Sequence, residues 1–342
     1  MKRIAAGLIL VVAAPLWGIP TYARRFSKSC IECHVGYPKL NYEAENFRYD
    51  SYIPQNYNPR MKTFPFRKDE RIYLPMNAPI SFRFKAFMGL LADSSKLSPK
   101  GDVGGAVFLS WNLSSISSFY VAAEYGDMLR NAFLSVKLPF RSRLLVGRYD
   151  LSEFFVKRTT RLTYYDLVPY TRANLYGTGV ALSFTPYFQI GMYDVSGART
   201  FIRAGANTKY FGFGIMAVPV DGAQRYALDL RVRFAFFDLF TTTVVGLNQK
   251  LGNFNLNDST AFITGDYGLD LTFGRFYTSL LYNYVGALQS ENLPSDHLSM
   301  LTWALGFYPV SNAKVSLELG YNFAARFPAD GTYGGLVIDW SF

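Results

Sequence analysis

The sequence predicts an all-β fold, a transmembrane antiparallel β-barrel of sixteen strands or alternatively fourteen. From Ala78 to Phe342, apolar and polar residues alternate over segments of about ten residues, as in barrels with one face in lipid. Aromatic residues make up 17% of the chain, with 25 Tyr and 30 Phe, yet its mean hydropathy is only +0.06. Beyond the N-terminus, no uninterrupted apolar stretch has the length of a transmembrane helix.

The alternation is clear in two segments. Ile80, Phe82 and Phe84 share one face of a predicted strand, while Arg83 and Lys85 share the other. In 230–234, Arg231 and Arg233 lie on the same side. A period of two is typical of a strand, and it places these cations in a lumen and the apolar residues against lipid.

The same pattern divides the rest of the chain into strands. The predicted strands are 78–92, 103–114, 118–126, 130–139, 142–150, 174–185, 188–195, 198–205, 208–219, 223–236, 238–249, 259–272, 274–287, 297–308, 313–325 and 331–342. An even number agrees with a bacterial single-chain barrel, and loss of 198–205 with one neighbour would leave fourteen.

The connections should differ between the two ends of the barrel. We expect tight periplasmic turns at Phe140-Arg141, Thr185-Pro186 and Tyr308-Pro309, and longer external connections at 93–102, 151–173 and 288–296. Short turns on one side and long loops on the other are typical of outer-membrane barrels.

The last strand supports the barrel independently. Leu336, Ile338, Trp340 and Phe342 share one face, and this terminal aromatic resembles the assembly signal of outer-membrane barrel proteins. The alternative is an edge strand of a soluble sandwich, but so aromatic an exposed edge would promote aggregation.

Residues 1–23 read as a secretory signal peptide. Lys2 and Arg3 precede an apolar stretch from Ile4 to Trp17, and Thr21-Tyr22-Ala23 forms a small-residue cleavage site. A retained anchor is the alternative, but the stretch is short for a span of about 20 residues. Removal of the two cations lowers the net charge from +10 to +8, which suggests a cationic lumen or contact with outer-membrane lipid. No basic helix or clustered patch indicates nucleic-acid binding.

Residues 24–77 form a segment of a different composition before the predicted barrel, 78–342. The segment is rich in Tyr, Pro, Asn and Arg, and it shows one plausible helix at 42–49. It is too short and too poor in aliphatic residues to enclose a cofactor by itself. We therefore expect it to plug or enter the lumen.

The stretch Cys30-Ile31-Glu32-Cys33-His34 is a C-x-x-C-H motif. Two thiols at this spacing add to the vinyl groups of a haem, and the adjacent histidine reaches the iron. These are the only two cysteines of the chain, so a four-cysteine zinc site is excluded, while a disulfide is the alternative. The motif predicts one covalent haem c in a short N-terminal monohaem segment.

With its leader, motif and barrel, the chain resembles the fused monohaem cytochrome–porins of the bacterial outer membrane, best known from iron-oxidising bacteria. The detailed likeness covers about residues 23–50: Ala23-Arg24-Arg25-Phe26-Ser27, the C-x-x-C-H motif, and Tyr37-Pro38-Lys39-Leu40-Asn41. The resemblance implies haem thioethers on Cys30 and Cys33, His34 as the proximal ligand, and electron transfer across the outer membrane. The barrel is on the short side, and the donor need not be shared.

Further residues carry weaker expectations. His297, Met61 and Met76 are candidate distal iron ligands, and an open or water-ligated position is the alternative. Arg83, Lys85, Arg231 and Arg233 could bind haem propionates or simply line a hydrated pore wall. Asp93 and Glu291 are too scattered to predict an iron site.

The leading functional hypothesis is an outer-membrane electron conduit. It would carry single electrons between an extracellular donor, plausibly Fe(II), and a periplasmic cytochrome, which would make the protein an electron-transfer protein or an Fe(II) oxidase. The alternative is a solute porin whose haem segment is a structural plug or a redox sensor. A haem peroxidase or gas sensor would need an open sixth iron position.

Overall fold

The computed structural model describes residues 34–36, 39–53, 68–69, 74–75, 79–93, 96–124, 127–151, 154–155, 176–184, 187–220, 223–247, 261–287, 297–310, 313–323 and 332–341. Two short strands outside the barrel, β3 (Lys68–Asp69) and β4 (Leu74–Pro75), pair with each other. The signal peptide and the boundaries of the predicted 24–77 segment lie largely outside these residues and stay predictions.

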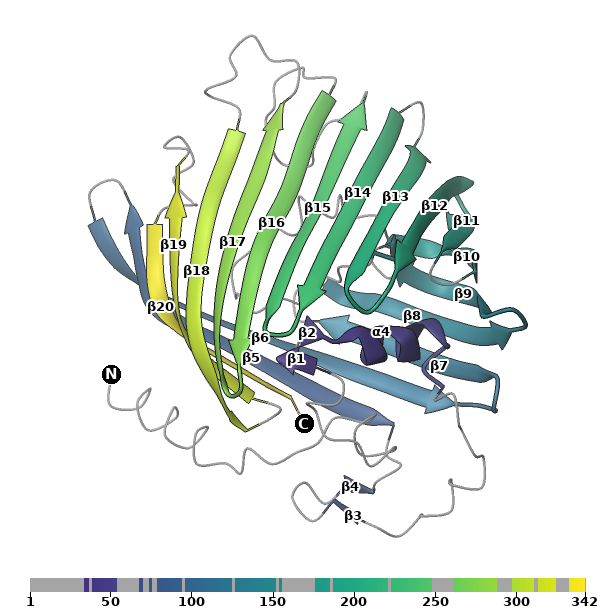
Figure 1. The fold of residues 1–342 in the computed structure, drawn as a ribbon, viewed down its shortest axis with the longest axis horizontal. Helices are drawn as coiled ribbons and strands as arrows, with labels where there is room; N and C mark the ends of the chain where they lie inside the picture. Colours follow the sequence, from purple (N-terminus) through teal and green to yellow (C-terminus); the bar gives the residue numbers. More distant parts are fainter. Residues whose placement is uncertain are drawn as a thin grey trace.

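Sixteen strands close into one antiparallel barrel (Figure 1). They are β5 (Ile80–Asp93), β6 (Lys96–Asn112), β7 (Ser117–Glu124), β8 (Asp127–Leu138), β9 (Ser142–Asp150), β10 (Tyr176–Phe184), β11 (Phe188–Asp194), β12 (Arg199–Asn207), β13 (Phe211–Val220), β14 (Ala223–Phe234), β15 (Phe237–Leu247), β16 (Ala261–Phe273), β17 (Phe276–Ala287), β18 (His297–Val310), β19 (Ala313–Asn322) and β20 (Thr332–Ser341). β20 pairs with β5 and closes the ring. The predicted sixteen strands are confirmed, including the weakest, which is β12.

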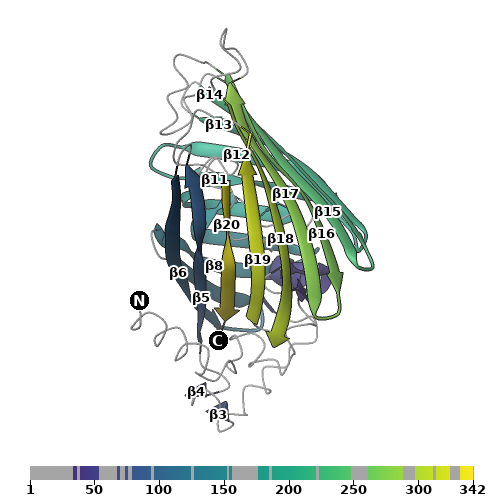
Figure 2. The same cartoon turned by 90° about the vertical axis from the view of Figure 1, so that its left-hand side faces the viewer.

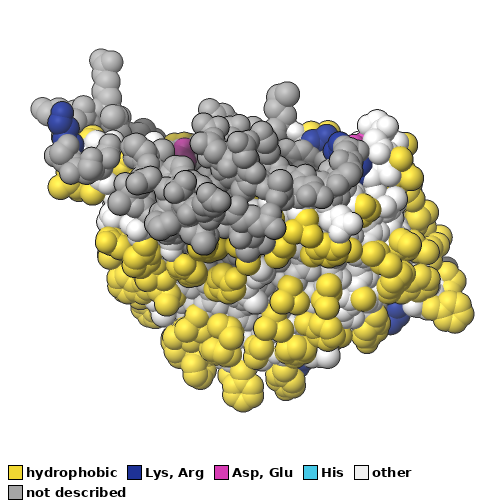
Figure 3. Space-filling view, turned by 90° about the horizontal axis from the view of Figure 1, so that it is seen from above, with side chains coloured by type: hydrophobic (Ala, Val, Ile, Leu, Met, Phe, Trp, Pro, Cys, Tyr) yellow, Lys and Arg dark blue, Asp and Glu magenta, His cyan; other side chains and the backbone are white. Residues whose placement is uncertain are grey.

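Side chains alternate between the lumen and the outer surface. Along β15, Asp238, Phe240 and Val244 are buried, whereas Leu239 between them is 43% exposed. The outward positions of the other strands are also largely apolar, and Figure 3 shows apolar side chains over much of the face seen from above. Arg231 and Arg233 are buried on the lumen side, as predicted.

The connections divide the barrel into two ends. At one end, which we call the short-turn end, β8 and β9 are joined by a tight hairpin in which Phe140 and Arg141 have φ of 57° and 54°. Left-handed backbone at both central residues matches the right-handed twist of the paired strands. At the other end, which we call the long-connection end, the strands are separated by 151–175, 248–260, 288–296 and 323–331.

Two predicted connections were wrong. The expected loop at 93–102 is mostly strand, because β5 and β6 continue as a hairpin in which Asp93 pairs with Lys96. Strand prediction relied on alternation, but a protruding hairpin needs only backbone pairing and no alternation of side chains. The tight turn predicted at Tyr308-Pro309 instead lies within β18, where the register with β19 is irregular between Phe307 and Val310. Proline lacks a backbone N–H, so it is tolerated at such an irregularity, where the pairing does not need that donor.

Glycines on the lumen side make room for close packing. A Cβ on Gly179 would lie 1.6 Å from the carbonyl oxygen of Met192. A Cβ on Gly268 would lie 2.1 Å from the Phe240 ring, and one on Gly320 2.0 Å from the Tyr333 ring. These aromatic rings therefore lie against the wall over glycines of the neighbouring strand.

Within the described part of the chain, no helix has both the length and the apolar character to cross a bilayer. The one described helix, α4 (Tyr42–Tyr49), confirms the predicted helix at 42–49. Figures 1 and 2 show it enclosed by the barrel strands.

Candidate functional site: the N-terminal segment in the lumen

Local sequence explains why α4 forms where it does. The Asn41 side chain accepts a hydrogen bond of 3.0 Å from the Ala44 amide, which caps the first turn. Glu43 and Glu45 lie in the first turn and Arg48 in the last, as the helix dipole favours. The helix stops where Ser51 and Tyr52 adopt φ of 62° and 60°, outside the helical range.

Lys39 anchors the start of the segment to the barrel wall. It belongs to β2 (Lys39–Leu40), and its ammonium lies 2.9 Å from Asp238 Oδ2 and also forms an ion pair with Asp270. The same ammonium lies 4.4 Å from the centroid of the Phe240 ring. Asp238 begins β15 and Asp270 is near the end of β16, so Lys39 lies at the short-turn end.

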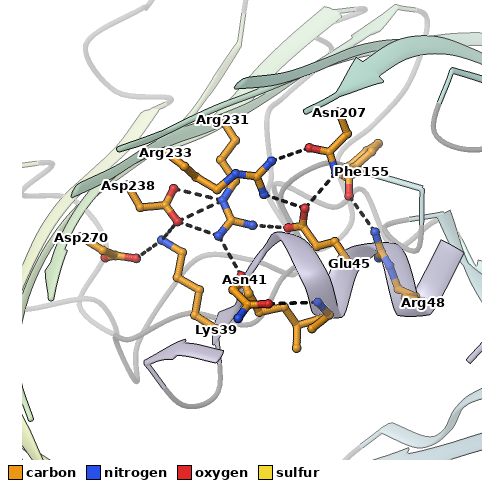
Figure 4. Close-up of polar contacts among 12 residues, drawn as sticks. Lys39, Asn41, Glu45, Arg48, Phe155, Asn207, Arg231, Arg233, Asp238 and Asp270 are labelled. Carbon is orange, nitrogen blue, oxygen red and sulfur yellow. Dashed lines mark hydrogen bonds and ion pairs between the residues drawn. The ribbon is translucent and has the colours of Figure 1, made fainter. Parts of the chain in front are cut away.

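Glu45 connects α4 to two arginines of β14. It forms ion pairs with Arg231 and, at 2.6 Å, with Arg233, and it accepts a hydrogen bond of 2.8 Å from Asn207 Nδ2 (Figure 4). Arg231 also donates to Asp238 and to the Leu40 carbonyl, so it contacts both the helix and β2. Glu45 is 1% exposed, so both oxygens of its carboxylate are satisfied away from bulk water. Removing one partner from a buried ion pair costs about 3–5 kcal/mol, because the other charge stays buried.

Arg143 of β9 contacts both the end of α4 and the chain segment that follows β9. Its Nη1 donates to the Arg48 carbonyl at 2.8 Å, and its guanidinium lies 5.9 Å from the rings of both Tyr49 and Phe154. Arg48 in turn donates to the Phe155 carbonyl. The start of the 151–175 connection, with buried Leu151, Phe154 and Phe155, thus folds inward against the segment.

The last described residues of the segment pack on β7 and β8. The Tyr52 ring stacks on Tyr120 with a centroid distance of 5.2 Å and an interplanar angle of 5°. Ser118 Oγ donates to the Ser51 carbonyl at 2.5 Å. Residues 39–53, which we call the plug segment, therefore contact β7, β8, β9, β12, β14, β15 and β16 from inside the barrel.

A cluster of buried apolar side chains lies inside the barrel and packs against Tyr52 of the plug segment. We call it the apolar collar; its members are Phe87, Phe133, Leu145, Phe201, Met216, Val244, Phe262, Val285, Met300 and Val337, all buried in one cluster. Porin lumens are generally polar and filled with water. An apolar ring in a pore opposes the passage of hydrated ions.

The predicted haem residues are described only in part. Cys30, Cys33, Met61 and Met76 lie outside the described residues. His34 begins β1 (His34–Gly36), and its backbone pairs with Leu40 of β2, next to Lys39. His297 begins β18 at the long-connection end, whereas the β1–β2 hairpin adjoins the Lys39 anchor at the short-turn end. Among the described side chains, no group of three His, Cys, Asp or Glu could hold a metal ion.

The four cations predicted to face the lumen separate into two groups. Arg231 and Arg233 hold Glu45 of the plug segment. Arg83 instead donates to both carboxylate oxygens of Asp339, at 2.9 and 2.6 Å. Sequence reasoning missed Lys39, Glu45 and Arg143. Only the unusual presence of charged residues in a short segment predicted to enter a barrel could have indicated Lys39 and Glu45.

Comparison with known proteins supports the fold. No protein-family model and no curated protein matches the chain. Among solved structures, the chain is similar to Salmonella typhi OmpF in complex with daunomycin, with a TM-score of 0.57 and 11% identity over 77% of this chain and 97% of that one. It is similar to the low-pH structure of Pseudomonas putida OprB, with a TM-score of 0.55 and 11% identity over 77% of this chain and 92% of that one. It is also similar to an anion-selective porin from Comamonas acidovorans, with a TM-score of 0.52 and 10% identity over 77% of this chain and 98% of that one.

These likenesses show the fold alone. The chain has the sixteen-stranded barrel of bacterial outer-membrane porins, and its apolar outer surface agrees with that environment. The predicted localisation in the bacterial outer membrane is confirmed at the level of the fold.

Proposed function

We propose that the protein is an outer-membrane channel barrel whose N-terminal segment acts as a plug at the short-turn end. The observation that carries this proposal is the set of buried ion pairs between Glu45 and Arg231 and Arg233. The apolar collar packs against the plug segment and disfavours water and ions beside it. A buried charge network of this kind sets the position of a segment more than it adds net stability.

Liposome swelling tests the channel directly. Liposomes that contain the full chain should admit small sugars slowly. A chain with Arg231→Met and Arg233→Met should admit them faster, because Glu45 loses both cationic partners. Equal rates for the two proteins, with both barrels folded, would contradict the plug.

A second function, electron transfer, is supported by the C-x-x-C-H motif and by the place of its last residue, His34, in β1. His34 pairs by its backbone with Leu40, whose carbonyl accepts a hydrogen bond from Arg231 of the wall. A haem attached at the motif would adjoin the barrel wall at the short-turn end, where guanidinium groups such as that of Arg83 suit propionates. The residues present therefore fit the group: Cys30 and Cys33 would hold it by thioethers, and His34 would bind its iron.

Bound there, a haem c would supply one-electron oxidation and reduction. The barrel would insulate it from lipid and leave partners access at the two mouths. We propose an extracellular donor, plausibly Fe(II), and a periplasmic cytochrome as these partners. A reduced-minus-oxidised spectrum tests this function: an α-band that appears on addition of Fe(II), and is absent in His34→Ala, supports it. A band that appears only with dithionite would exclude Fe(II) as the donor.

A further inference from the structure

One sector of the barrel wall is built from short strands. β9, β10 and β12 have 9 residues each and β11 has 7, whereas β16 has 13 and β18 has 14. The four short strands are neighbours in the ring (Figure 1). The barrel wall is therefore low over one continuous sector, from β9 to β12.

A seven-residue strand does not cross an outer membrane. At about 3.3 Å per residue, β11 is about 23 Å long, and a tilt of about 40° reduces its height to about 18 Å. The apolar band of an outer-membrane barrel is about 25 Å tall. The turn after β11 is polar, because Asp194 Oδ1 accepts hydrogen bonds from the amides of Ser196 and Gly197. In a bilayer of that thickness, this turn would lie below the outer edge of the apolar band.

A charged side chain lies on the outer face of the same sector. Arg143 and Leu145 of β9 are buried on the lumen side, so alternation places Arg148 on the outside. Arg148 donates a hydrogen bond of 2.7 Å to the Leu129 carbonyl. It is six residues beyond the start of β9 at the short-turn end, a height of about 15 Å. An arginine that faces lipid near the bilayer midplane is strongly disfavoured, so this face suits a protein neighbour better than lipid.

The outward residues of the sector form a flat aliphatic surface. Val146 pairs in register with Val180, and Ile190 pairs with Ile202. These four side chains are 40–45% exposed. Together with the two outward residues between them, they make up the short-wall face, which we define as Val146, Val180, Leu182, Ile190, Met192 and Ile202. Aliphatic side chains of similar size let another surface approach closely along the whole band.

The far side of the barrel has a different outer surface. β18 lies eight strands from β10 in the ring of sixteen, and its 14 residues are enough to cross a bilayer. The neighbouring β19 exposes Tyr321 near the long-connection end, and tyrosine is typical of the membrane interface. Leu305 of β18 is 48% exposed, much like Val180. The far side thus suits lipid and supplies matched control positions.

We propose that the short-wall face binds the same face of a second copy of this chain. A two-fold axis along the membrane normal, beside β10, brings β10 of each copy against β10 of the other. Two walls of equal low height then cover each other. Neither of them faces lipid, so the mismatch between the short strands and the bilayer is removed.

The charges at the edge of the face suit this symmetry. Arg148 pairs in register with Thr178, and the Thr178 carbonyl accepts a hydrogen bond from the amide of Val195, next to Asp194. Arg148 on β9 and Asp194 on β11 thus lie on either side of β10 at one level. The two-fold axis directs the arginine of one copy toward the aspartate of the other. Both groups keep the contacts within their own chain, and the symmetry makes opposite charges neighbours instead of like charges.

Native mass spectrometry of the full chain, released from detergent micelles, tests the self-association. The parent should have the mass of two chains. Val180→Trp should weaken the dimer about tenfold or more, because two bulky rings would meet beside the axis. Leu305→Trp is the matched control and should leave the dimer intact. Ile190→Trp repeats the test on β11 if Val180→Trp fails to fold. A monomeric parent, or a dimer that the variants at 180 and 305 affect equally, overturns the proposal.

A second experiment tests the same face in a bilayer. In a Cys30→Ser/Cys33→Ser chain, Val180→Cys or Leu305→Cys carries a bimane fluorophore, and the phosphatidylcholine vesicles contain lipid with a nitroxide on its acyl chain. Bimane at 305 should be quenched several-fold more than bimane at 180. Dilution of the protein with lipid should raise the quenching at 180, because the copies separate.

The two other occupants of the face give different results. Equal quenching at 180 and 305 at every dilution would show that lipid covers the face and that the bilayer thins beside the low wall. Quenching at 180 that stays low at every dilution would show that the chain covers the face by itself. Either result overturns the proposal.

Discussion

The Arg233 guanidinium lies 2.6 Å from the Glu45 carboxylate, although 188 residues separate the two in the chain. Arg233 belongs to the barrel wall and Glu45 to the helix inside it. The pair is buried, so it fixes the helix at one position and depth in the lumen.

Glu45→Gln should loosen the helix. The substitution removes the charge that satisfies two buried arginines but keeps an amide oxygen that can accept their hydrogen bonds, so we expect a loss of about 1–3 kcal/mol and not the full cost of a missing partner. Trypsin cleavage after Arg48 should become about 10–100-fold faster if cleavage follows local opening. Glu43→Gln is the matched control, because Glu43 lies on the exposed side of the same helix. Equal cleavage rates in the two variants would show that Glu45 does not hold α4.

Arg143→Met should loosen two segments at once. Arg143 contacts the Arg48 carbonyl and the rings of Tyr49 and Phe154, so its loss removes contacts of both α4 and the start of the 151–175 connection. Hydrogen exchange should accelerate at the backbone amides of both α4 and the start of the 151–175 connection. Arg148→Met, farther along the same strand, removes a contact with the Leu129 carbonyl instead and should leave both segments protected. Faster exchange in only one segment would contradict a shared contact.

Two glycine substitutions should differ sharply in their effect on the barrel. Gly179→Ala forces a methyl group to within 1.6 Å of the Met192 carbonyl oxygen, and a backbone atom cannot rotate away. We expect a loss of at least about 3 kcal/mol in the free energy of unfolding, measured in urea. Gly104→Ala meets no atom within 4 Å, and should change that free energy by less than about 0.5 kcal/mol. A comparable loss in both variants would mean that the close approach at Gly179 is wrong.

Replacing Cys30 and Cys33 by serine should abolish covalent haem while the barrel still folds. The sixteen strands pair among themselves in a closed ring, so we expect the barrel to fold without these cysteines. The expected result is loss of the c-type α-band with normal heat-modifiable migration on gels. A band that survives the double substitution would refute thioether attachment at this motif.

The barrel was predictable because its physical signal is repeated sixteen times. Each strand must place apolar residues toward lipid and other residues toward the lumen, so even the weak segment at β12 follows from its neighbours and from parity. The 93–102 hairpin was not predictable in this way. Beyond the membrane, both faces of a hairpin meet water, and the alternation that identifies a strand disappears.

The candidate site was only partly predictable. The C-x-x-C-H motif and the helix at 42–49 depend on local sequence, and α4 forms where predicted. The charged partners of Lys39 and Glu45 are 186 to 231 residues away, and no local pattern indicates which wall charges they meet. Arg231 and Arg233 were expected in the lumen, but their role in holding Glu45 required the fold.

Single-channel conductance in planar bilayers tests the central claim, which is that the plug segment closes the short-turn end of the lumen. We predict that the full chain shows little steady conductance, as does Glu43→Gln, and that Glu45→Gln shows frequent openings of porin size. If the full chain instead conducts steadily at porin level, and Glu45→Gln changes nothing, the segment does not close the channel.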